Sequence, residues 1–170
     1  EMPERTRRGN GSIMKITHLK INHLVNPLGY DLERPTISYV VEETRAKRQV
    51  KARVMVSLSE SFEDMVYDSG ESEDITSTAF ELPIQTEPET RYYWKVRVWA
   101  DNGDAAESGA AWFETPKPDK WQADWITPDV SKEMQVSLLR RVTIRKPVKR
   151  ARMYMTGLGL YELYLNGEKQ

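Results

Sequence analysis

The stretch YYWKVRVW, residues 92–99, decides the fold. Tyr92, Trp94, Val96 and Val98 stand at every second position, and most of the residues between them are polar or charged. A repeat of two is the side-chain period of a β-strand that has one buried face. We therefore expect residues 92–99 to form a strand whose aromatic residues, Trp94 above all, face a core.

The same period occurs on both sides of this stretch. VKARVMVSL at residues 50–58 and TISYVVE at residues 36–42 alternate in the same way, and no long amphipathic helix pattern is present. Clusters of Gly, Pro, Asn and Asp separate the alternating segments and predict turns. Seven short strands of this kind are typical of a β-sandwich; besides the three quoted, they are predicted at residues 15–21, 65–67, 78–82 and 111–114.

Residues 116–120, Pro-Lys-Pro-Asp-Lys, interrupt the strand pattern and predict a short stiff linker. Strand patterns resume after it, at residues 138–144, 151–155 and 160–165, and Asn166-Gly167 predicts a hairpin turn. The sequence ends three residues after that turn, and so few strands do not bury two sheets.

These patterns predict an all-β protein with two domains. We expect a disordered leader over residues 1–13, a β-sandwich over 14–115, the linker over 116–120, and the truncated start of a second β-sandwich over 121–170. The leader has no apolar segment of the kind that secretory signals contain, which favours a cytoplasmic location.

The composition excludes several classes of function. The 170 residues carry 25 basic and 26 acidic side chains, for a net charge of −1, so we expect no nucleic-acid partner. No run approaches the roughly 18 apolar residues of a membrane span. With no cysteine and only two histidines, the chain has little material for a metal site or a nucleophilic triad, and we predict no cofactor.

Two charged segments are candidates for chemistry. We interpret the acidic one as a solvated edge, and the basic one as a solvent face or as a surface that docks against an acidic partner domain. The acidic stretch lacks the spacing of a calcium loop and shows no cleft for a catalytic carboxylate pair; it consists of Glu60, Glu63, Asp64, Asp68, Glu71, Glu73 and Asp74. The basic block has almost no aromatic residues for stacking bases; it consists of Arg140, Arg141, Arg145, Lys146, Lys149, Arg150 and Arg152. We predict no catalytic, cofactor-binding or metal-binding residue.

The five tryptophans raise the question of a sugar-stacking surface, since indole faces stack on sugar rings. Trp94 is predicted to be core and Trp99 to lie on the opposite face of its strand, while Trp112 alternates with Ala111 and Phe113. Trp121 and Trp125 are predicted to hold the linker against the sandwiches. A glycine pair at residues 157–159 lacks the third glycine of a phosphate loop. His18 and His23 are predicted to be surface or edge residues with no functional role.

A family resemblance rests on motifs in a fixed order. Residues 88–103 resemble the corner and following strand of a fibronectin type III domain, where a tyrosine at the position of Tyr92 hydrogen-bonds back across the corner. With FET at 113–115, WQADWI at 121–126 and GLYELYLNG at 159–167, the chain is similar to the N-terminal region of bacterial α-L-rhamnosidases.

This resemblance implies an immunoglobulin-like sandwich followed by a second sandwich in a non-catalytic accessory region. The parent glycosidase would remove terminal α-L-rhamnose with inversion, using carboxylates of a downstream helical barrel. The expected partner is that catalytic domain. Whether a rhamnose-containing carbohydrate is a second partner is left open. Two alternatives remain open: a carbohydrate- or protein-binding type III module with no enzyme attached, and a small hydrolase complete in itself.

Overall fold

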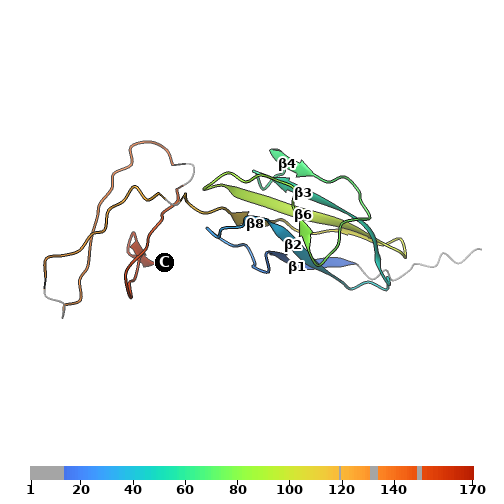
Figure 1. The fold of residues 1–170 in the computed structure, drawn as a ribbon, viewed down its shortest axis with the longest axis horizontal. Helices are drawn as coiled ribbons and strands as arrows, with labels where there is room; N and C mark the ends of the chain where they lie inside the picture. The colour runs from blue at the N-terminus through green and yellow to red at the C-terminus, as the bar shows by residue number, and fades with distance from the viewer. Residues whose placement is uncertain (1–13, 119, 131–133, 149–150) are drawn as a thin grey trace, which may run out of the picture. The chain divides into compact units, whose positions relative to one another are not determined.

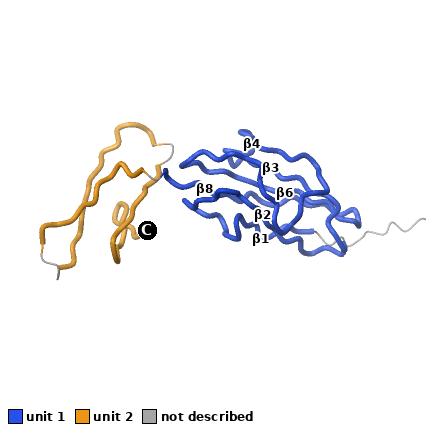
Figure 2. The backbone as a smooth tube through the Cα atoms, viewed as in Figure 1, with its two compact units in different colours: residues 1–119 blue, residues 120–170 orange. Residues whose placement is uncertain are grey.

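A computed structural model describes residues 14–118, 120–130, 134–148 and 151–170. The predicted leader over 1–13 lies outside the described residues. The chain divides into two compact units, residues 1–119 and 120–170 (Figure 2). Regular structure in the described ranges consists of strands, which confirms the predicted all-β class. None of these ranges contains a helix that is long and apolar enough to cross a membrane.

The first unit contains two antiparallel sheets (Figure 1). One sheet has the order β1-β2-β5, formed by β1 (Lys15–Ile21), β2 (Thr36–Glu42) and β5 (Phe80–Glu81). The other has the order β4-β3-β6-β7, with β8 also paired to β6; it consists of β3 (Gln49–Ser57), β4 (Met65–Asp68), β6 (Arg91–Ala100), β7 (Ala105–Glu107) and β8 (Ala111–Glu114). All seven predicted strands are present, and β7 is additional.

The core lies between these sheets and draws on both. The alternate residues of β6 enter it, with Trp94 only 1% exposed and Val96 fully buried. Val96 pairs with the equally buried Val54 of β3, and Ile37 and Tyr39 contribute from β2. Burying one large apolar side chain stabilises a fold by about 1.5–3 kcal/mol, so this inward row is the main source of stability.

The second unit contains one hairpin among its described residues, formed by β9 (Tyr164–Leu165) and β10 (Glu168–Lys169). Asn166 and Gly167 have φ of 54° and 87° between these strands, which confirms the predicted turn. The strands predicted at 138–144 and 151–155 are wrong for this structure, and the one at 160–165 is reduced to its last two residues. A strand needs a neighbour for its backbone hydrogen bonds, and the described residues offer these segments none.

Candidate functional site

The corner before β6 is closed by a tyrosine. The Tyr92 hydroxyl accepts a hydrogen bond of 2.8 Å from the backbone N–H of Glu87, and its ring stacks on Phe113 with centroids 5.1 Å apart. The Thr115 hydroxyl donates to the Glu87 carbonyl at 2.6 Å and accepts from the Thr90 N–H at 2.9 Å. The contact expected of Tyr92 is therefore present, and the corner is bonded to the segment that leads into the linker.

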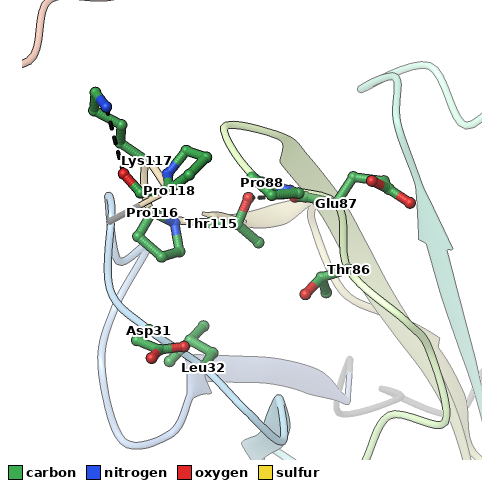
Figure 3. A pocket seen from close by; sticks show the side chains of 9 residues that line it. All are labelled: Asp31, Leu32, Thr86, Glu87, Pro88, Thr115, Pro116, Lys117 and Pro118. Atoms are coloured by element: carbon green, nitrogen blue, oxygen red, sulfur yellow. Dashed lines mark hydrogen bonds between the residues drawn. The ribbon is translucent and has the colours of Figure 1, made fainter. Parts of the chain in front are cut away.

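An open hollow of about 250 Å³ lies beside this corner (Figure 3). Its lining consists of Asp31, Leu32, Thr86, Glu87, Pro88, Thr115, Pro116, Lys117 and Pro118. Asp31 and Glu87 are both exposed, and the Glu87 carboxylate points away from Asp31 (Figure 3). Glycoside hydrolysis needs one protonated and one ionised carboxylate held on either side of a bond in a water-poor pocket. The hollow does not provide that arrangement.

The tryptophans of the first unit are already in contact with protein groups. Trp94 is core, as predicted. The Arg91 guanidinium lies 4.0 Å from the centroid of the Trp112 ring, and Lys51 and Arg97 lie 5.0 and 5.1 Å from that of Trp99. Such cation–π contacts stabilise the pair by about 0.5–1 kcal/mol at an exposed site. A sugar would have to compete with these cations for the indole faces.

Arg91 also pairs with a buried acid that the sequence reasoning missed. Its Nε lies 3.0 Å from Oε2 of Glu114, whose side chain is only 5% exposed. The two residues face each other in the register of β6 and β8. This ion pair and the neighbouring Trp112 contact join the last strand of the unit to its central strand, which is a structural role.

Trp121 and Trp125, the predicted anchors of the linker, are both exposed in this structure. Trp121 is 45% exposed and Trp125 is 67% exposed, so neither side chain is buried as an anchor requires. The reason is that the second unit has no buried apolar residue among those described, and therefore no core to receive an indole.

The acidic stretch is solvated surface, as predicted, because all seven of its carboxylates are exposed. Two of them pair with bases on β3: Glu71 with Lys51, and Asp68 with Arg53. The Arg53 hydrogen bond holds the pKa of Asp68 below its usual value. No group of three potential ligands capable of holding a metal occurs among the described residues.

The remaining predicted surface residues are exposed where the structure describes them. His18 and His23 are exposed, and so are the bases of the basic block, of which Lys149 and Arg150 lie outside the described residues. The glycine pair at 157–159 lies outside the strands, and Gly159 has a φ of 99°.

The profile of one known family, the Rha78A-like N-terminal immunoglobulin domain, matches residues 16–118. The chain belongs to this family. The match covers the first unit, and the immunoglobulin fold of the Rha78A-like domain agrees with the two packed sheets described above.

The relatives of this Rha78A-like chain are named α-L-rhamnosidases. One from Streptomyces avermitilis is 32% identical over 68% of the chain, and one from Formosa agariphila is 28% identical over 88%. The chain spans 12% and 19% of the length of these two relatives. It is thus similar to a small part of each.

Two solved structures are similar to it as well. The Streptomyces avermitilis α-L-rhamnosidase complexed with L-rhamnose aligns over 61% of the chain with a TM-score of 0.52 and 31% identity. The α-L-rhamnosidase of Dictyoglumus thermophilum aligns over 66% with a TM-score of 0.57 and 28% identity. The chain covers 10% and 14% of those two structures, which again places the likeness in a short region of a large protein.

Proposed function

We propose that this chain is a non-catalytic accessory region of an α-L-rhamnosidase. The observation that carries the proposal is the family match over residues 16–118, together with relatives named α-L-rhamnosidase of which the chain spans only 12–19%. In the wider proposal, the parent is a bacterial enzyme of carbohydrate metabolism, and its catalytic domain is the partner of this region. The type III subclass of the sandwich and the cytoplasmic location stay predictions.

The surroundings of the acidic side chains that the structure describes support an accessory role. An inverting glycosidase holds two carboxyl groups roughly 6.5–9.5 Å apart, one as acid and one as base to a water molecule. Most acids of the described residues are exposed, Glu42 and Asp104 are half-buried, and Glu114 is buried in an ion pair. We propose that the parent uses the inverting mechanism with carboxylates from its catalytic domain.

We further propose that residues 121–170 begin a second sandwich that strands from the rest of the parent complete. Eighteen large apolar side chains are exposed among the described residues of 120–170, with Leu139 at 83% and Leu158 at 87%. Exposed apolar surface on this scale is unfavourable in water and is normally covered. The β9–β10 hairpin offers a start for such a sheet, because a two-stranded hairpin alone is marginally stable.

The proposed function is tested by assaying three proteins on an aryl α-L-rhamnoside: the 170-residue chain, the parent protein, and the parent without residues 1–118. We expect no hydrolysis by the chain and hydrolysis by the parent. Hydrolysis by the 170-residue chain would contradict the accessory role. An inactive but folded parent would contradict the assignment as a rhamnosidase. Proton NMR of the sugar anomer that is released first tests the inverting mechanism, which predicts the β-anomer from an α-rhamnoside.

A carbohydrate-binding role is a second candidate, and one observation favours it: Trp125 is 67% exposed, and exposed indoles are groups on which sugar rings stack. Titration of the chain with L-rhamnose in a calorimeter tests this role. Heat of binding that disappears in Trp125→Ala and persists in Trp99→Ala would support it. An absence of heat in both the chain and the parent lacking its catalytic domain would contradict it.

A further inference from the structure

The loop between β1 and β2 presents an uncharged apolar surface. Its sequence over residues 25–30 is Val-Asn-Pro-Leu-Gly-Tyr, and Val25, Leu28 and Tyr30 are 66%, 50% and 54% exposed. We call these three side chains the 25–30 apolar loop. They stand within six residues of one another, whereas the other exposed large apolar residues of the first unit occur singly or, at Met65 and Val66, as a pair. Exposing such groups to water is unfavourable.

The backbone of this loop is fixed by bonds to β8. The Asn26 side-chain oxygen accepts a hydrogen bond of 3.0 Å from the Trp112 N–H. On the other side, the Glu114 N–H donates to the Pro27 carbonyl and the Gly29 N–H donates to the Glu114 carbonyl, both at 2.9 Å. Asn26 has a φ of 46°, a conformation that asparagine tolerates better than most residues. The apolar side chains are therefore held in place in advance, which lowers the entropy cost of docking them.

The loop lies beside the point where the chain leaves the first unit. Its partner Glu114 ends β8, two residues before Pro116 begins the linker. Figure 1 shows the blue loop between β1 and β2 at the same end of the first unit as β8. Whatever follows along the polypeptide belongs to the same chain, so its docking on the 25–30 apolar loop is intramolecular, and such a link raises the effective local concentration of the partner.

The small area of the 25–30 apolar loop favours a partner in the same polypeptide over a separate protein. A stable interface between separate proteins buries about 800 Å² on each side, which is more than three side chains supply. A tethered partner needs far less area, because it does not lose translational freedom again on docking. We propose that the 25–30 apolar loop docks against an apolar surface in the part of the parent rhamnosidase that follows Gln170. This inference rests on the proposed function, in that it assumes a longer parent chain.

Hydroxyl-radical footprinting of the parent and of the 170-residue chain tests the docking without reference to catalysis. We expect the labelling of Leu28 and Tyr30 to fall about five-fold in the parent, as half-exposed side chains become buried. Val40, on β2 and 43% exposed, is the internal control and should label equally in both proteins. In the parent, Leu28→Asp should restore the labelling of Tyr30, whereas Val40→Asp should leave it low.

The other outcomes overturn the proposal in distinguishable ways. Equal labelling of Tyr30 in the chain and in an active parent would refute the docking and leave the rhamnosidase assignment standing. An inactive parent in which Tyr30 is nevertheless protected would refute the assignment and support the docking. A concentration-dependent dimer of the 170-residue chain, seen by sedimentation equilibrium and lost in Leu28→Asp, would make a second copy the partner.

Discussion

The two units of the chain have similar strand patterns and very different structures. Among the residues that the structure describes, the first unit buries 19 apolar residues, whereas the second exposes 18 large ones and buries none. The difference lies in pairing. In the first unit β6 has β3 on one side and β7 and β8 on the other, whereas residues 138–144 have no neighbouring strand. An alternating sequence therefore allows a segment to form a strand, but the segment joins a sheet only where a neighbouring strand is present to pair with it.

The largest expected effect is on the core of the first unit. Trp94→Ala should lower the free energy of unfolding by about 3–5 kcal/mol, because it removes a fully buried indole and leaves a cavity. Circular dichroism during urea unfolding measures the change. The matched control in the second unit is Ile144→Ala, whose side chain is 62% exposed and whose removal should leave the same transition unchanged. Equal losses of unfolding free energy in the two variants would contradict the difference between the units.

A smaller effect is expected at the corner. Tyr92→Phe removes the hydroxyl that accepts from the Glu87 N–H but keeps the ring on Phe113. The loss should be about 1 kcal/mol, the net worth of one hydrogen bond, read as a lower urea midpoint with an unchanged slope. Tyr93→Phe, on the other face of β6, is the control and should have no such effect. A neutral Tyr92→Phe would mean that the tyrosine hydroxyl does not stabilise the corner, which ring packing and the Thr115 hydrogen bonds would then hold.

The smallest effect is electrostatic and depends on pH. Arg53 lowers the pKa of Asp68 in the folded state, so this carboxylate stabilises the fold above its unfolded pKa of about 3.9. That contribution is lost as the pH falls through the lower folded pKa. Asp68→Asn should therefore be slightly less stable than the wild type at pH 7 and equal to it at the acid end of the range. A stability difference between Asp68→Asn and the wild type that stays constant with pH would contradict the assignment.

Local pattern predicted most of the first unit and failed at particular places. The bounds expected for β1 and β2 agree with those observed, since each has a clear apolar face and turn residues at its ends. The short strand β7 was missed because Ala-Ala-Glu has little alternation, and it forms through its pairing with β6. The strands of the second unit were over-predicted for the opposite reason, because local alternation carries no information on whether a partner strand is present.

The contacts between residues that are far apart in the chain could also not be predicted from local sequence patterns. Asn26 and Trp112 are 86 residues apart, and the Arg91–Glu114 pair spans 23 residues, so their meeting depends on strand register. The Tyr92 contact was predictable because it belongs to a known corner motif within five residues. The exposure of Trp121 and Trp125 was not predictable from local sequence, because their burial requires a core that the described residues of the second unit lack.

Hydrogen exchange across both units, in the 170-residue chain and in the parent protein, tests the central claim most directly. We predict slow exchange in β3 and β6 in both proteins, because these strands have their partners within the first unit. Residues 121–170 should exchange fast in the chain and slowly in the parent, where further strands cover them. Equal, strong protection of both units in the 170-residue chain would contradict the account, because it would show that the second unit completes its sheets without any further part of the parent.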